Sequence, residues 1–275
     1  MTRATCLFVF MLACCAVCTA DSNVDPAENT RYGWAENAGW ADAYADGTNG
    51  VEVTPFILSG YIWQENVGWI CLGDGTPDTP PQYSNASATD YGVNHDAAGH
   101  LSGYAWGENI GWVVFDTSGA GGSQVTISPL GEFAGYAWSE NIGWINMASG
   151  YGVQLLDSDG DQIPDAFETD SGLFVSEYDT GTASYEYDSD GDDLNDGVEV
   201  HTYHTDPNDE DTDDDTITDG DEIHGVYEYV TNPLEEDTDG DTYDDWTEIV
   251  EGTDPTDPED YPGSGLSGLE VPIFR

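Results

Sequence analysis

Four segments in the second half of the chain share one acidic pattern, which constrains this sequence more than any other feature. Each reads D-x-D-x-D-x-h-x-D-x-x-E, where h is apolar or aromatic, and they span 157–168, 188–199, 211–222 and 237–248. Residues 151–275 carry 40 of the 56 acidic side chains of the chain, with only short apolar islands between them. Such a segment cannot bury a sizeable hydrophobic core, so its folding requires another source of free energy.

The spacing of these carboxylates matches the requirements of calcium. Ca²⁺ takes about six to eight oxygen ligands, and alternate residues of a curved loop can direct oxygens toward one point. Without a cation, carboxylates held this closely would repel one another strongly. Mg²⁺ is less suitable because it prefers a tighter octahedral shell with retained water. We therefore predict Ca²⁺ as the cofactor, bound through loop positions 1, 3, 5, 9 and 12. The predicted ligands are Asp157, Asp159, Asp161, Asp165, Glu168, Asp188, Asp190, Asp192, Asp196, Glu199, Asp211, Asp213, Asp215, Asp219, Glu222, Asp237, Asp239, Asp241, Asp245 and Glu248.

The acidic loops are followed by short connectors such as Thr205-Asp206-Pro207 and Thr253-Asp254-Pro255. Together, loops and connectors resemble the thrombospondin type 3 repeat in its cysteine-free bacterial form over about 155–262. This resemblance implies successive loops that wrap calcium ions with little secondary structure, forming a rod or spacer without catalysis. The chain departs from the family at loop position 6, where the usual glycine is replaced. The replacing residues are Gln162, Asp193, Thr216 and Thr242.

The first half of the chain contains a different repeat, Y-x-W-x-E-N-x-G-W, with copies at 31–40, 60–70, 103–113 and 135–145. Tyrosine and tryptophan two residues apart project from one face of a strand, and the Glu-Asn pair followed by glycine favours a tight turn. Each copy is therefore predicted to form a β-hairpin. Such units must pack together to bury their faces. We expect a mainly β chain, with a propeller-like or solenoid-like module followed by an extended, loop-rich calcium-binding stalk.

The tryptophans of these repeats allow two interpretations. The favoured one is that one tryptophan per strand packs a small β core, as large aromatic side chains usually do. The alternative is ligand binding, in which exposed rings stack on sugars or surround a cationic group beside the repeated glutamates. The candidate ligand-binding residues are Trp34, Trp63, Trp106 and Trp138, and the glutamates are Glu36, Glu65, Glu108 and Glu140. The repeats also resemble those of uncharacterised exported bacterial proteins.

The first 20 residues read as a secretory signal peptide, because an apolar run after Arg3 ends in the small-residue site before Asp21. A lipid anchor at Cys14 is the less favoured interpretation, since the apolar stretch before it is short. No other segment is apolar enough to span a bilayer. The predicted organisation is therefore signal peptide 1–20, aromatic module 21–154, calcium-binding repeats 155–262 and flexible tail 263–275, in a secreted or cell-surface protein.

Charge and motif content limit the function. The chain has three basic residues and a formal charge of −53, which excludes nucleic acid as a partner. Motifs for catalysis are absent, so we expect a protein that is not an enzyme and has no catalytic residues. The expected function is that of an exported calcium-binding structural or adhesive protein of the cell surface or extracellular matrix. The alternative is a lectin-like carbohydrate-binding module. Expected partners are calcium ions and a glycan or another surface protein.

Overall fold

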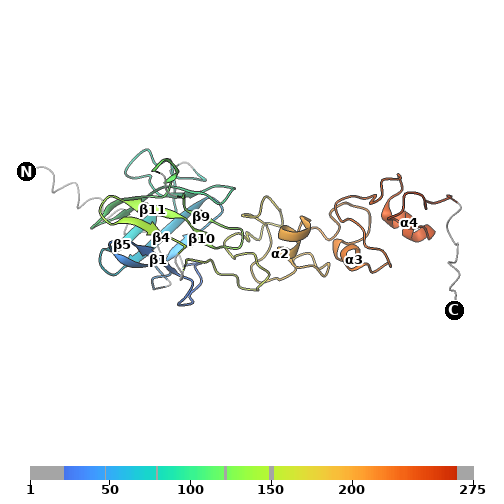
Figure 1. The fold of residues 1–275 in the computed structure, drawn as a ribbon, viewed down its shortest axis with the longest axis horizontal. Helices are drawn as coiled ribbons and strands as arrows, with labels where there is room; N and C mark the ends of the chain where they lie inside the picture. The colour runs from blue at the N-terminus through green and yellow to red at the C-terminus, as the bar shows by residue number, and fades with distance from the viewer. Residues whose placement is uncertain (1–21, 47, 79, 121–122, 149–151, 265–275) are drawn as a thin grey trace, which may run out of the picture. The chain divides into compact units, whose positions relative to one another are not determined.

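The computed structural model of the protein describes residues 22–46, 48–78, 80–120, 123–148 and 152–264 (Figure 1). The predicted signal peptide, the anchor candidate Cys14 and most of the predicted tail lie outside these residues. The chain forms two compact units, Met1–Asp170 with Val175–Thr180 and Ser171–Phe174 with Gly181–Arg275. This division differs from the sequence boundary at 154/155, because the first acidic loop belongs to the first unit.

Each aromatic repeat forms an antiparallel β-hairpin, as predicted. The glycine that opens the second strand of each hairpin has a φ between 73° and 94°, a backbone conformation that disfavours other residues. The two tryptophans of a repeat are direct cross-strand partners, as Trp34 and Trp40 are in the first hairpin. The hairpins are β1 (Tyr32–Ala35) with β2 (Gly39–Asp42), β4 (Ile57–Gln64) with β5 (Gly68–Gly73), β7 (Leu101–Gly107) with β8 (Gly111–Val114), and β11 (Tyr136–Ser139) with β12 (Gly143–Asn146).

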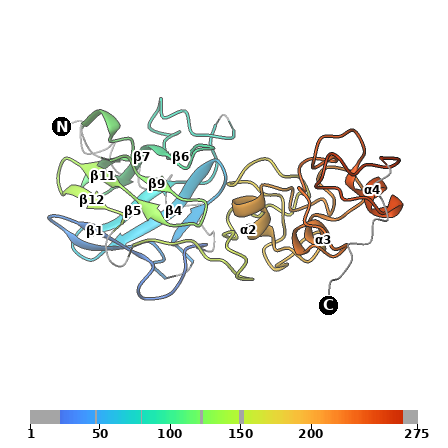
Figure 2. The same ribbon diagram turned by 45° about the vertical axis from the view of Figure 1, so that its right-hand side comes forward.

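The eight hairpin strands close into an antiparallel barrel (Figure 2). Neighbouring strands follow the order β2-β1-β12-β11-β8-β7-β5-β4, and pairing between β4 and β2 completes the ring. The predicted mainly β class is confirmed, with 25% strand and 10% helix. The predicted propeller-like or solenoid-like arrangement is wrong. Each repeat supplies one hairpin rather than a blade, and both edges of every hairpin pair with neighbours, so closure removes the open edges.

The barrel has an aliphatic interior and an aromatic exterior. Strand alternation directs small or branched side chains inward, and an eight-stranded barrel leaves room for little more than these. The inward residues are at most 6% exposed: Ala35, Ala41, Ile62, Ile70, Ala105, Val113, Ala137 and Ile145. The tryptophans point outward, and six of them are 37–44% exposed. The favoured expectation of a tryptophan-packed core is therefore wrong. The tyrosine and the first tryptophan of each repeat lie two residues apart and share one face of the strand, and in this barrel that face is the outer one.

A ring of asparagine side chains joins the four turns at one end of the barrel. The asparagine of each Glu-Asn pair donates a hydrogen bond from its Nδ2 to a backbone carbonyl in the neighbouring hairpin. The four bonds are Asn37 to Ile142 (3.2 Å), Asn66 to Ala38 (2.6 Å), Asn109 to Val67 (2.9 Å) and Asn141 to Ile110 (2.9 Å). The asparagine of the repeat thus links hairpins to one another, and four copies are needed to close the ring.

Short strands complete the first unit. β3 (Val51–Val53) pairs with β4, β6 (Val93–His95) pairs with β4 and β7, and β9 (Thr126–Ile127) with β10 (Phe133–Ala134) forms a separate sheet. The 3-10 helix η1 covers Ser118–Ala120. The segment after β12 packs on this unit through aromatic contacts: the fully buried His95 stacks on Phe167, with ring centroids 5.9 Å apart, and meets the Tyr178 ring edge-on at 5.0 Å.

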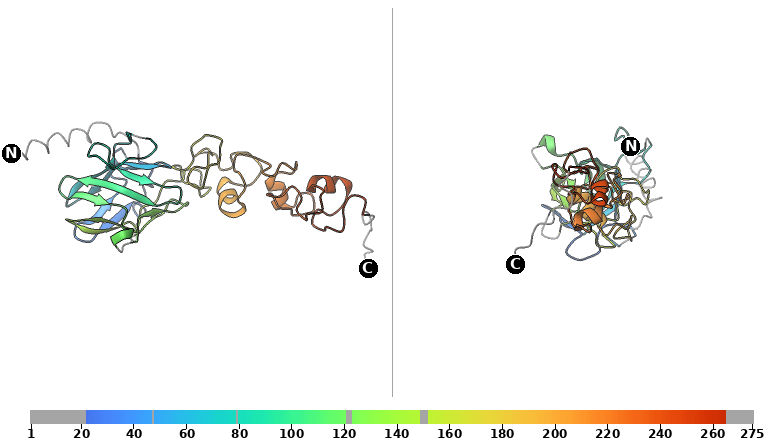
Figure 3. Two further views of the ribbon diagram at one scale, coloured as in Figure 1. Left: turned by 90° about the horizontal axis from the view of Figure 1, so that it is seen from above. Right: turned by 90° about the vertical axis from the view of Figure 1, so that its right-hand side faces the viewer.

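The second unit carries short helices that each begin inside an acidic loop (Figure 3). α2 (Asp196–Val198) continues into the π-helical turn η2 (Glu199–Tyr203), and α3 (Asp219–His224) and α4 (Asp245–Glu251) follow. Each α-helix starts at loop position 9, after an N-cap residue at position 8 whose side chain accepts a backbone N–H. Positions 9 and 12 are three residues apart, so the helix places both carboxylates on one face. Within the described ranges, none of the helices has the length and apolar character required to cross a bilayer.

Candidate metal centre

The acidic loops are held in one conformation by the aspartate at position 1. In the first loop, Asp157 accepts backbone N–H groups of Gly160 (2.7 Å) and Gln162 (3.2 Å), and Asp188 and Asp237 repeat this pattern in the second and fourth loops. Positions 4 and 6 both have positive φ in all four loops. At position 6 this conformation is adopted by Thr216 (φ 92°) and Thr242 (φ 93°), which is strained for a β-branched residue.

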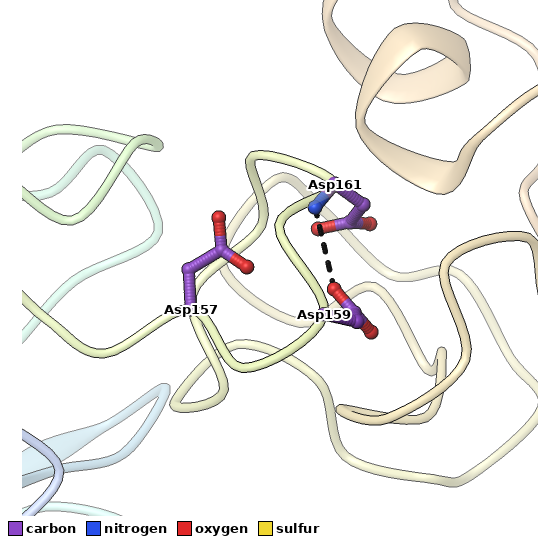
Figure 4. Close-up of side chains that lie close together, drawn as sticks. All are labelled: Asp157, Asp159 and Asp161. Carbon is purple, nitrogen blue, oxygen red and sulfur yellow. Dashed lines mark hydrogen bonds between the residues drawn. The ribbon is translucent and has the colours of Figure 1, made fainter.

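Positions 1, 3 and 5 bring three carboxylates together in each of the first three loops. One oxygen from each of Asp157, Asp159 and Asp161 lies within 4.8 Å of the others, and the corresponding trios of the next two loops do the same. Figure 4 shows the first trio, with the backbone N–H of Asp161 donating to Asp159 at 3.3 Å. The structure therefore brings these predicted ligands together within single loops.

The aspartate at position 9 accepts two hydrogen bonds from position 2 of its own loop. Its Oδ1 accepts the backbone N–H of position 2, and its Oδ2 accepts the hydroxyl of the serine or threonine there. In the third loop Asp219 accepts both groups of Thr212, at 2.9 and 2.7 Å, and in the fourth Asp245 accepts both groups of Thr238, at 2.9 and 2.7 Å. Asp165 with Ser158 and Asp196 with Ser189 have the same arrangement. Position 9 thus closes its own loop.

Position 9 also contributes to a second kind of cluster, which joins successive loops of the second unit. Oxygens of Asp192 and Glu199 from the second loop and Asp219 from the third lie within 4.8 Å of one another, and all three residues are buried. The Oδ2 of Asp192 accepts the backbone N–H of Gly220 at 2.7 Å, which fixes this register between the loops. One loop further on, the backbone N–H of Trp246 likewise donates to Asp215.

The glutamates at position 12 of the second, third and fourth loops are fully buried. Glu199, Glu222 and Glu248 are at most 1% exposed, and each has at least one carboxylate oxygen without a hydrogen-bond partner among the described residues. Desolvation, followed by the charges of neighbouring aspartates, raises the pKa of Glu199 to about 9, that of Glu222 to about 8 and that of Glu248 to about 7. Buried carboxylates with unsatisfied oxygens require either a proton or a cation.

Calcium fits this donor set better than zinc or copper does. All the clustered side-chain donors are carboxylate oxygens, which are hard ligands, whereas zinc and copper sites use sulfur or imidazole donors. Asp190 is destabilised as an anion in the same way: burial, followed by the negative charge of Asp192, raises its pKa to about 7. A divalent cation would remove this repulsion and satisfy the unpaired oxygens.

Two sets of supporting residues were not identified from the sequence. The first is the serine or threonine at loop position 2, whose hydroxyl holds the position 9 aspartate. The second is the connector threonine: Thr205 is buried and donates its hydroxyl to Oε1 of Glu199 at 3.2 Å. Both were visible as repeated features, since position 2 is Ser, Ser, Thr and Thr and each of the last three loops is followed by Thr-x-Pro.

The candidate ligand-binding tryptophans do not form one site. Trp34, Trp63, Trp106 and Trp138 lie on four different hairpins around the outer wall of the barrel, each packed edge-to-face on the second tryptophan of its own hairpin. The ring centroids of these pairs are 4.7–4.8 Å apart.

Comparison of the chain with protein-family models, curated proteins and solved structures found no match.

Proposed function

We propose that this chain is an exported calcium-binding structural or adhesive protein of the cell surface or extracellular matrix, in which calcium rigidifies the C-terminal repeats into a stalk. One observation carries the proposal: the fully buried position 12 glutamates, with unpaired oxygens, adjoin the aspartates of their loops. The repeated spacing and the resemblance to thrombospondin type 3 repeats support it.

Charge counting supports the same proposal. The second loop and its neighbour direct five carboxylates toward adjoining clusters, those of Asp188, Asp190, Asp192, Glu199 and Asp219. One Ca²⁺ would leave three negative charges in a largely buried region, and a second would leave one. Because Asp192 belongs to both clusters, ions bound at the two positions would share it as a ligand. Loops connected in this way would become ordered together when calcium binds.

The test is calcium removal from the full chain. Circular dichroism and hydrodynamic radius are compared in calcium, in magnesium and in EDTA, and bound calcium is counted by equilibrium dialysis. We expect an expanded, less ordered chain in EDTA and recovery in calcium but not in magnesium. Glu248→Gln should lower calcium affinity at the fourth loop, whereas Glu251→Gln, exposed on the same helix, should not. Identical behaviour in calcium and EDTA would refute the proposal.

The alternative proposal, a carbohydrate-binding module presented on the stalk, has in its favour the exposure of the barrel tryptophans. Glycan-array binding that disappears in Trp63→Ala or Trp106→Ala, while the barrel stays folded, would support it. Without any sugar binding, the structural role would be preferred.

A further inference from the structure

The four seams between neighbouring hairpins repeat one arrangement on the outer wall of the barrel. In the first seam the backbone N–H of Glu36 donates to the carbonyl of Trp144 at 3.0 Å, which places the two residues opposite each other. Trp34 lies diagonally across the same strand pair, within reach of a large side chain. By the strand register, the other seams contain Trp63, Glu65 and Trp40; Trp106, Glu108 and Trp69; and Trp138, Glu140 and Trp112.

The seams are negatively charged and accessible. All four glutamates are exposed, and none makes a side-chain hydrogen bond or ion pair within the described residues. The only arginine or lysine that the structure describes is Arg31, which lies at the far end of the first hairpin, bound to Asp42. Indole rings present a negative face. A carboxylate between two indoles is therefore complementary to a cation.

The ring geometry favours a cation over a sugar. The tryptophan pairs meet at interplanar angles of 60–73°, so the edge of one ring covers the face of the other and the two do not form a coplanar platform. Each neighbouring asparagine already uses one N–H of its side-chain amide on a carbonyl of the adjacent hairpin. The charged group of each seam is a carboxylate without a counter-charge.

The protein itself contains one cation that is bound by aromatic rings and a carboxylate. The guanidinium of Arg31 lies 5.1 Å from the ring centroid of Tyr32 and 5.5 Å from that of Tyr44, and one of its nitrogens is 3.3 Å from Asp42. A guanidinium thus sits between aromatic rings and a carboxylate on the first hairpin. Arginine suits such a position better than lysine, because its planar group stacks on rings and bonds carboxylates bidentately.

We propose that the four seams form a repeated surface that binds arginine side chains of a basic polypeptide. A single shallow contact of this kind strengthens binding only about two- to five-fold, so useful affinity requires several seams at once. Neighbouring seams are two strands apart, or about 10 Å at the backbone, and are farther apart at the side-chain tips because the wall of a closed barrel curves. Three residues of extended chain span about 10 Å, so a peptide with arginine at every third position presents an arginine within reach of each seam that it crosses.

The test uses the full chain with saturating calcium and a fluorescent (Arg-Gly-Gly)₄ peptide, with anisotropy as the readout. We expect binding that weakens at least ten-fold when citrulline, the neutral isostere, replaces arginine. The quadruple variant Glu36→Gln, Glu65→Gln, Glu108→Gln, Glu140→Gln should weaken it similarly. A matched quadruple changes exposed glutamates outside the seams by the same charge: Glu28→Gln, Glu132→Gln, Glu235→Gln and Glu251→Gln.

Each outcome decides the question. Loss of affinity in the seam variant but not in the matched variant supports the proposal, provided that near-ultraviolet circular dichroism shows intact tryptophan pairs. Equal loss in both variants would identify non-specific attraction to the acidic chain and overturn it. Binding of chito- or cello-oligosaccharides that survives the seam substitutions would overturn it in favour of a lectin surface.

Discussion

Substitution of Glu199 by glutamine should stabilise the calcium-free protein and reduce the further stabilisation that calcium provides. The folded-state pKa of Glu199 is raised to about 9 from an ordinary value of 4.5, mainly by desolvation. A carboxyl group with a raised folded pKa reduces stability increasingly as pH rises from its ordinary pKa to its folded one. At pH 7.5, about three units above the ordinary value, the calcium-free fold loses about 4 kcal/mol through this group. The glutamine side chain has no charge to desolvate, so E199Q should stabilise the calcium-free protein.

In calcium the same substitution removes a proposed ligand. At a free calcium concentration of about 100 times Kd, one site stabilises the fold by about 2.7 kcal/mol, and a 100-fold weaker site would retain about 0.4 kcal/mol. E199Q should therefore reduce the stability gained on adding calcium by about 2 kcal/mol, from about 2.7 to about 0.4 kcal/mol. Thr205 can still donate to the glutamine carbonyl, so the local fold is preserved.

Urea unfolding followed by far-ultraviolet circular dichroism, in EDTA and in calcium, measures both effects. Glu235→Gln is the matched control, because Glu235 is exposed and lies outside the loops. The control should shift stability by less than about 0.5 kcal/mol in either condition. Failure of E199Q to stabilise the protein in EDTA, or an unchanged gain in stability on adding calcium, would refute the proposed role of this glutamate.

The same contacts support three further predictions. Asp219→Asn should weaken calcium binding more than Asp214→Asn, an exposed change of equal charge in the same loop, and its effect should be non-additive with that of Glu199→Gln in calorimetric titrations. Calcium affinity should rise between about pH 6 and pH 9, because the raised pKa values of the clustered carboxyls require proton release on binding; a pH-independent affinity would contradict this. Asn109→Ala should destabilise the barrel by about 1 kcal/mol in urea unfolding, whereas Glu108→Ala should leave it nearly unchanged.

Much of the local structure could be predicted from repeated residues. The Glu-Asn pair and the following glycine predicted four hairpins, because a two-stranded turn depends on residues close in sequence. The trios at loop positions 1, 3 and 5 were predictable for the same reason, since one loop contains all three aspartates. The additional cluster of Asp219 with Asp192 and Glu199 could not be predicted in this way, because it depends on how two loops pack.

The sequence by itself determined the repeats, the hairpins and the oxygen-rich chemistry of the loops, all of which follow from spacing within a dozen residues. Tertiary structure alone decided that the hairpins close into a barrel, since closure depends on which hairpin edges pair. It also placed the tryptophans outside: alternation puts tyrosine and tryptophan on one face, but only closure decides which face is the interior. Tertiary structure also decided the asparagine ring and the carboxylate clusters between loops. Their partners come from neighbouring repeats, so the sequence within one repeat does not predict these contacts.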